Sequence, residues 1–344
     1  MPQATDDLQL EHSIVSDFSY REMARFVRRK ELTDIAKTFT ANIDRVAALA
    51  ELPIFLIYRM TRFMLASIDA NEAVLGRSRV TAADLGRSQE IAAFIQGRQG
   101  EEKNKFANPK VDDAQGWKTA LSHYMGAVFS KDGPTFLGAL SLLSAMTTGA
   151  WTAYESLATD LWIAAVNLRP NDLGVNALLA KENAKGEAEP TPFSLNILRK
   201  YKFDLANSLG TMIWRERKFN FNALDGIKNA YFSTFCIRDN KGNRRGVPEE
   251  VKSWFPSSAS ADLAILEAIR HSLVHRGGLP DPSFRERVKG CPVLKDLNDG
   301  DRIPLNGVMV STHIKCVLEQ TKMLLEGVDK WLGCERMRNI DAVG

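Results

Sequence analysis

The chain has 344 residues, of which 44% are hydrophobic and 25% are charged. This balance is typical of a folded globular protein and excludes disordered, collagen-like and low-complexity classes. The 45 Lys and Arg residues almost balance the 42 Asp and Glu residues, for a net charge of +3, so any surface that binds a polyanion has to be local.

Cysteine usage and hydropathy indicate the cellular compartment. Cys236, Cys291, Cys316 and Cys334 form no closely spaced pair, which argues against a disulfide framework and against a structural zinc module. The N-terminus lacks the basic and apolar regions of a secretory signal. The longest uncharged run, 133–154, is diluted by Gly, Ser and Thr and indicates a buried helix. We therefore expect a cytoplasmic protein with no membrane segment.

The first third of the chain is expected to be helical after a short flexible tail at 1–12. Apolar residues recur with helical spacing over 19–49 and again over 54–67. The sequence Thr-Ala-Ala-Asp from Thr81 predicts the start of a helix that continues to Ile95. We assign an N-terminal helical region to 13–97.

A second domain is expected at 117–344, after a polar linker or long loop at 98–116. Its first predicted element is one long helix over 137–167, in which apolar residues recur at alternating steps of three and four. Two further helices are predicted at 192–213 and 223–236.

The remaining elements are separated by clear helix-breaking and turn signals. Loops are predicted at 181–191 and 238–258, where Gly, Pro and charged residues cluster. A helix follows that begins at Ser258 or Ser260 and ends at Gly277 and Gly278. Asn306 and Gly307 predict a β-hairpin over 302–310, before a final helix at 312–332. The predicted fold is therefore an all-α helical bundle with one small β-hairpin before the last helix, plus an N-terminal helical extension.

One arginine lies on the apolar side of the helix that ends at Gly277. On a helical wheel Arg270 lies about 40° from Leu266 in the apolar arc. Because an unpaired buried guanidinium would cost several kcal/mol, we expect a carboxylate partner from another helix. Glu155 is the best candidate, with Asp160 and the same-helix Glu267 as alternatives.

Three interpretations compete for this helix end. It can be purely structural, with His275 and Arg276 complementing the helix dipole. Glu267, His271 and His275, each one helical turn apart, could bind a metal ion. The third interpretation is acid–base chemistry on an RNA phosphodiester, because a histidine can transfer protons near neutral pH and an arginine can stabilise the charge of the transition state without a metal.

The sequence Arg270-His271-Ser272-Leu273-Val274-His275, followed by two glycines, resembles the signature of the HEPN superfamily. That signature has an Arg, a polar residue, three further positions and a His at the end of a helix. The surrounding sequence, including the helix that carries Glu155, the stretch Phe219-Asn220-Phe221 and the final helix, is similar to the HEPN type called RiboL-PSP. The resemblance covers 117–333.

The resemblance implies a helical bundle that forms a homodimer, so that two copies of the motif face one cleft. It implies a metal-independent RNA endonuclease without a cofactor, often a toxin or an antiviral defence effector, and leaves room for an antitoxin or a defence-system partner protein. His275 would be the acid–base group, Arg270 the cation and His271 the polar partner, in place of the usual Asn or Asp, with Glu155 beside them. The alternative is a catalytically silent HEPN protein that binds RNA or other proteins.

Basic residues offer two candidate RNA-binding surfaces. Over 199–228 seven Lys and Arg residues outnumber three acidic ones and alternate with aromatic residues, which is typical of single-strand binding. The alternative is an amphipathic helix pair whose aromatic residues face the core. The predicted loop at 238–258 supplies further cations. The residues expected to contact RNA are Lys241, Arg244, Arg245, Arg215 and Lys218.

Overall fold

The computed structural model divides the chain into two units. One consists of Met1–Gln9 and Ala48–Leu142, and the other of Leu10–Ala47 and Leu143–Gly344. Each unit is described separately. The structure describes residues 20–77, 89–93, 134–183, 193–238, 244–298 and 300–333. The predicted tail, the predicted linker at 98–116 and Lys241 lie outside these residues.

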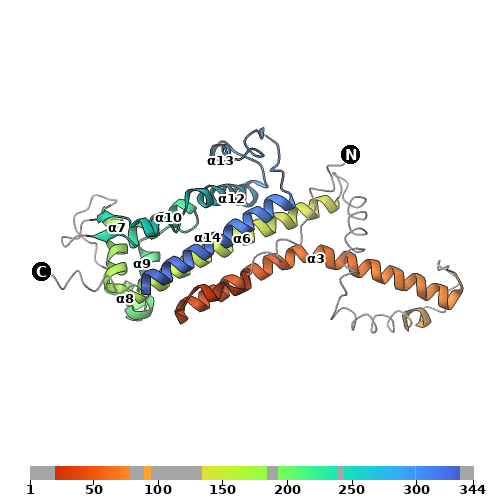
Figure 1. The fold of residues 1–344 in the computed structure, drawn as a ribbon, viewed down its shortest axis with the longest axis horizontal. Helices are drawn as coiled ribbons and strands as arrows, with labels where there is room; N and C mark the ends of the chain where they lie inside the picture. The colour runs from red at the N-terminus through yellow and green to blue at the C-terminus, as the bar shows by residue number, and fades with distance from the viewer. Residues whose placement is uncertain are drawn as a thin grey trace. The chain divides into compact units, whose positions relative to one another are not determined.

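The larger unit is built around helices α6 (Pro134–Leu168), α12 (Ser257–Arg276) and α14 (Gly307–Gly333). The predicted long helix at 137–167 is confirmed by α6. Its apolar stripe is fully buried, as at Met146 and Leu161, and so are Trp151 and Trp162 beside it. Helices α12 and α14 pack against each other (Figure 1).

Helix α10 (Leu224–Thr234) joins this core through hydrogen bonds of buried side chains. The Tyr231 hydroxyl donates to the carbonyl of Ala158 at 2.8 Å, and the indole N–H of Trp162 donates to the Thr234 hydroxyl at 2.9 Å. Burying these two aromatic side chains with their polar atoms satisfied avoids the desolvation cost of an unpaired donor.

The N-terminal region also contributes to the larger unit. It forms a 3₁₀ segment η1 (Tyr20–Phe26) and the first part of α3 (Lys30–Leu75), in which Leu32 and Phe39 are buried. Arg29 connects this region to α14, because its guanidinium donates to the carbonyl of Leu332 at 2.6 Å. The segment predicted at 19–49 is divided between η1 and α3, and from Lys30 it continues without a break through the segment predicted at 54–67. The described part of the helix predicted from Thr81, 89–93, is helical.

The helix predicted at 192–213 is interrupted. A turn separates α8 (Leu195–Lys200) from α9 (Leu205–Glu216), and Lys202 and Phe203 in it have positive φ angles of 55° and 58°. Asp204 then begins α9 by accepting a hydrogen bond from the N–H of Asn207 at 3.2 Å, which is the bond of a helix N-cap. The elements of this region are η3 (Pro170–Gly174), α7 (Val175–Asn183), α8 (Leu195–Lys200) and α9 (Leu205–Glu216).

The all-α class with one small hairpin before the last helix is confirmed. In the described residues the hairpin consists of β1 (Ile237–Arg238) and β2 (Arg244–Gly246), followed by α11 (Glu249–Lys252). The predicted position of the hairpin, 302–310, is wrong.

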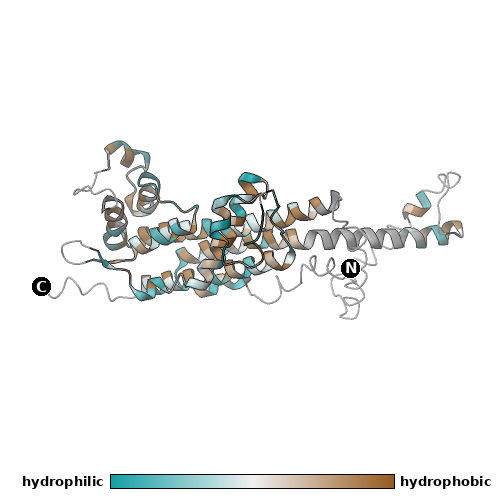
Figure 2. Ribbon diagram, turned by 90° about the horizontal axis from the view of Figure 1, so that it is seen from above, coloured by the Kyte–Doolittle hydropathy of each residue, from teal (hydrophilic) through white to brown (hydrophobic). Residues whose placement is uncertain are grey.

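The residues of that expected turn instead begin α14. The side chain of Asn306 accepts the N–H of Met309 at 2.8 Å, so it acts as a helix N-cap rather than as a turn residue. In Figure 2 polar and apolar residues alternate along the helices, as expected when one face of each is buried. Among the described residues, no helix combines the length and apolarity needed to cross a bilayer.

Candidate functional site

The C-terminal end of α12 is fixed by hydrogen bonds and by a left-handed glycine. Gly277 has a φ of 62°, and its N–H and that of Gly278 both donate to the carbonyl of Ser272. The Ser272 hydroxyl donates to the carbonyl of Leu279 at 2.8 Å. The predicted helix end at Gly277 and Gly278 is confirmed, and this cap holds the last turn of α12 in place.

Two histidines lie side by side on this last part of α12. His271 and His275 are both exposed, and their ring centroids are 4.7 Å apart with the rings tilted by 49°. Because the residues are one helical turn apart, the helix itself sets this distance. His271 also lines a small pocket between α12 and α13 (Pro282–Arg287). The polar residues around it are Ser272, Arg276, Asp281, Ser283 and Arg287.

Asp281 connects α12 to α13 beside this pocket. Its carboxylate accepts the N–H of Phe284 at 2.7 Å, which caps α13, and pairs with the guanidinium of Arg276 at 2.7 Å. The hydrogen bond from Phe284 lowers the pKa of Asp281, and the charges of Arg276 and His271 lower it further. The pocket therefore carries a carboxylate that stays ionised, next to a cation and an imidazole.

Glu267 is tied to two other elements and is not available as a ligand. Its carboxylate accepts the N–H of Leu224 at 2.8 Å and pairs with Arg287 at 2.9 Å. Ala223, the N-cap of α10, offers no side-chain hydrogen bond, so Glu267 supplies the missing cap from α12. Within the part of the chain that the structure describes, no three His, Cys, Asp or Glu residues are grouped to hold a metal ion.

Arg270 lies on a different side of α12, opposite Glu155 of α6. Burial raises the pKa of Glu155, whereas the charge of Arg270 and, more weakly, the indole N–H of Trp151 lower it. The charge of Arg270 thus acts on Glu155, but the two groups do not form the ion pair expected for a buried guanidinium. The Nε of Arg270 is buried and forms no hydrogen bond within the described residues.

The structure does not bring Arg270 and His275 together within one chain. Five residues apart on a regular helix, they lie about 140° apart around its axis. Arg270 is half-buried beside Glu155, whereas His275 is exposed beside His271. Arg276 and Arg287 are the cations that share a pocket with an imidazole. Sequence reasoning gave Arg287 no role, because α13 follows the motif with no signal of its own.

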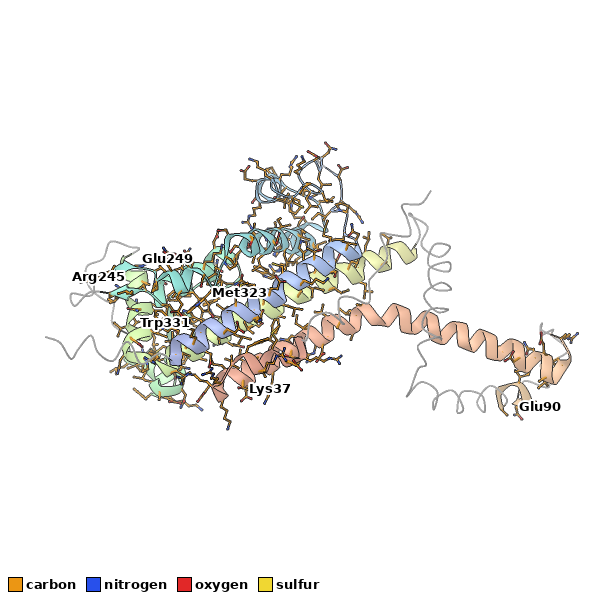
Figure 3. All side chains as sticks on the ribbon, viewed as in Figure 1. Lys37, Glu90, Arg245, Glu249, Met323 and Trp331 are labelled. Carbon is orange, nitrogen blue, oxygen red and sulfur yellow. The ribbon has the colours of Figure 1, made fainter. Side chains whose placement is uncertain are left out.

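The predicted RNA-binding residues lie on other elements than α12. Arg215 is exposed near the end of α9, with its guanidinium 5.5 Å from the ring centroid of Trp214, and Lys218 is exposed just after that helix. Arg244 and Arg245 are exposed on β2 (Figure 3 labels Arg245), and Arg244 donates to the carbonyl of Phe232 at 3.2 Å. The structure thus places these cations in two surface regions, on α9 and on β2.

The aromatic residues of the basic segment divide between core and surface. Phe219 and Phe221 are buried against Trp162, with ring centroids 5.0 and 5.7 Å from its ring. For these two the alternative, an aromatic residue that faces the core, is correct. Phe203 is different, because its side chain is 60% exposed.

Comparison with known proteins does not assign the chain to a family. No protein-family model matches it, and neither a curated protein nor a solved structure matches it. Function has to be argued from the geometry of the α12 end and from the resemblance in its sequence.

Proposed function

We propose that the chain is a metal-independent RNA endonuclease of the HEPN type that acts through the end of α12. The observation that carries this proposal is the exposed pair His271 and His275, with ring centroids 4.7 Å apart beside a pocket that contains Arg276 and Arg287. Two imidazoles can divide the work of proton transfer near neutral pH, one acting as base and the other as acid.

The reaction balances without a cofactor. A neutral imidazole takes the proton of the RNA 2′-hydroxyl, whose oxygen forms a bond to phosphorus. The bond from phosphorus to the 5′-oxygen breaks, and the protonated imidazole gives its proton to that leaving oxygen. The products are a 2′,3′-cyclic phosphate and a 5′-hydroxyl. The guanidinium groups of Arg276 and Arg287 each pair with one carboxylate, Asp281 and Glu267, and use their remaining N–H groups to stabilise the charge that develops on the phosphate oxygens.

A second copy of the chain belongs to this proposal. Val274 and Leu279, on either side of His275 in the sequence, are 50% and 41% exposed. Exposed apolar side chains next to the two imidazoles form a surface that a partner protomer would cover. In such a homodimer two histidine pairs would face one cleft. We further propose that the enzyme works in the cytoplasm as a toxin or an antiviral effector. An antitoxin or a defence-system protein would inhibit it.

A catalytically silent HEPN module is the second candidate. It is favoured by the position of Arg270, the cation of the sequence motif, which is half-buried beside Glu155 rather than exposed with His275. If Arg270 were required on the phosphate, this chain would bind RNA or a protein partner without cleaving RNA.

The experiment that tests the proposal is RNA cleavage by the purified full-length chain in the presence of EDTA. We expect products that end in a 2′,3′-cyclic phosphate, and no cleavage where a 2′-deoxynucleotide replaces the ribonucleotide at the cleavage site. Cleavage of the deoxy-substituted RNA, or dependence on a divalent metal, contradicts the mechanism. Binding without cleavage supports the silent module.

A further inference from the structure

The corner between α8 and α9 concentrates positive charge. Residues 199–218 contain six Lys and Arg residues and two carboxylates, whereas the whole chain has a net charge of only +3. The corner is therefore a local basic surface on a chain whose charges otherwise cancel. Its exposed cations and its exposed aromatic residue, which define the α8–α9 corner below, are Arg199, Lys200, Lys202, Phe203, Arg215 and Lys218.

Both carboxylates of the segment are already engaged. Asp204 caps α9 by accepting the N–H of Asn207, and Glu216 accepts a hydrogen bond from Lys200 at 2.8 Å and from the Tyr201 hydroxyl at 3.4 Å. The bond from Lys200 lowers the pKa of Glu216, so this carboxylate stays ionised and paired. Within the described residues Arg199, Lys202 and Lys218 have no acidic partner, and their charges are available to an anionic ligand.

Phe203 presents an aromatic ring at the tip of this corner. Its backbone is fixed by a hydrogen bond from its own N–H to the carbonyl of Leu198 at 2.9 Å, and the N–H of Lys202 bonds to the carbonyl of Arg199 at 3.0 Å. Among the described residues, the non-glycine positions with positive φ are Lys202, Phe203 and Lys218, and all three belong to this corner. A turn held in this way fixes the backbone that carries the exposed ring, directly after the cation Lys202.

We propose that the α8–α9 corner binds single-stranded RNA, with a base stacked on the ring of Phe203 and the backbone phosphates neutralised by Arg199, Lys202 and Lys218. Stacking on an aromatic ring combined with phosphate neutralisation is how proteins bind single strands without reading their sequence. The inference rests on the proposed function only in naming RNA as the nucleic acid, and it adds a substrate-holding surface on an element other than α12.

An anionic membrane surface is a poorer fit to the same residues. Membrane-surface helices bury one long apolar face in the bilayer. Helix α8 spans only Leu195–Lys200, and α9 turns Met212 and Ile213 into the protein core. The exposed leucines of the two helices, Leu195 and Leu205, lie one at the start of each helix and do not form a continuous face. Neither helix therefore offers an apolar face of the length that membrane binding requires.

The test is binding of a fluorescent uridine oligonucleotide to the full-length chain that carries His271→Ala and His275→Ala, so that cleavage cannot interfere. We expect tighter binding of the single strand than of an RNA duplex of equal length. Phe203→Leu, which keeps an apolar side chain but removes the ring, should weaken binding about tenfold. Lys218→Gln should weaken binding and reduce the slope of the logarithm of affinity against the logarithm of salt concentration by about 0.7.

Lys37→Gln is the matched control, because Lys37 is an exposed cation on α3 (Figure 3), and it should leave both quantities unchanged. Equal binding of RNA by the Phe203→Leu variant, or equal affinity for polyglutamate, overturns the inference. Binding to phosphatidylserine vesicles that depends on Phe203, without RNA binding, also overturns it. Because cleavage is measured separately on the chain with both histidines, loss of this inference and loss of the proposed function are distinguishable.

Discussion

The guanidinium of Arg270 on α12 lowers the pKa of the Glu155 carboxylate on α6, although the two groups do not form an ion pair. Burial acts more strongly in the opposite direction, so the pKa of Glu155 is raised overall. The folded chain therefore holds the proton of Glu155 to higher pH than the unfolded chain does. It follows that this group favours folding at low pH and that the contribution is lost as the pH rises through the folded pKa.

Replacement of the cation should make that pH dependence steeper. In Arg270→Met the pKa of Glu155 rises further, because only the effect of burial remains together with a weak contribution from Trp151. We expect a loss of about 1 kcal/mol in the free energy of unfolding at about pH 8, and a smaller loss at acidic pH, because protonation of Glu155 removes its interaction with the cation. Urea denaturation at the two pH values measures this. Adding Glu155→Gln should restore most of the stability, and an equal loss at both pH values contradicts the pairing.

Adding one methyl group at Gly277, in the C-terminal cap of α12, should reduce the stability of the fold. Gly277 has a φ of 62°, and a Cβ atom there would meet no neighbouring atom within 4 Å. The cost of Gly277→Ala therefore comes from the backbone conformation alone and should be about 1 kcal/mol. Gly290→Ala is the matched control, since its position is also open but its φ is not in the left-handed region. Equal thermal melting of the two variants contradicts the role of the cap.

Glu267, a residue of α12, should stabilise the N-terminus of α10. Glu267→Ala removes the acceptor of the Leu224 N–H and the partner of Arg287, and we expect a loss of about 1 to 2 kcal/mol in unfolding free energy. Glu267→Gln keeps an acceptor oxygen and should cost less. Guanidinium denaturation of both variants distinguishes these cases, and an Ala variant as stable as the native chain shows that the interaction contributes nothing.

A buried histidine should lower the stability of the folded chain at acidic pH. His313 on α14 is 7% exposed, and burial lowers its pKa from 6.5 to about 4. Between these values the unfolded chain binds more protons than the folded chain, so stability falls as the pH decreases. The full effect is up to about 3 kcal/mol. His313→Leu should flatten the dependence of unfolding free energy on pH in this range, and a variant with the native slope contradicts the assignment.

The fold was predictable where local signals and long-range packing agree. The apolar stripe of α6 and the glycine end of α12 both follow from residues close in sequence. The carboxylate partner expected for Arg270 does not follow in the same way, because the charge of Arg270 acts on Glu155 without an ion pair. Asn306 and Gly307 show the limit of such signals. The same pair suits a hairpin turn and a helix N-cap, and burial of the α14 residues that follow decides for the cap.

The site was only partly predictable because its geometry depends on contacts between distant residues. Glu267 of α12 bonds to Leu224 of α10 and to Arg287 of α13. Nothing in the sequence indicates that these three helices meet. Phe203, Phe219 and Phe221 belong to the same basic segment and cannot be told apart by sequence. Phe219 and Phe221 are buried, whereas the turn before Asp204 leaves Phe203 exposed. Helical spacing gives both the histidine pair and its separation from Arg270 around the axis of α12. That Arg270 is half-buried while both histidines are exposed required the packing of α12 to be known.

The rate of RNA cleavage under single-turnover conditions in EDTA tests the central claim most directly. The native chain should cleave with a bell-shaped dependence on pH, because one imidazole must be neutral and the other protonated. His271→Ala and His275→Ala should each lower the rate at least about a hundredfold, and the double variant should lose little more. Lys37→Gln should keep the native rate. Native cleavage by either histidine variant, provided that the variant is folded, would contradict the account.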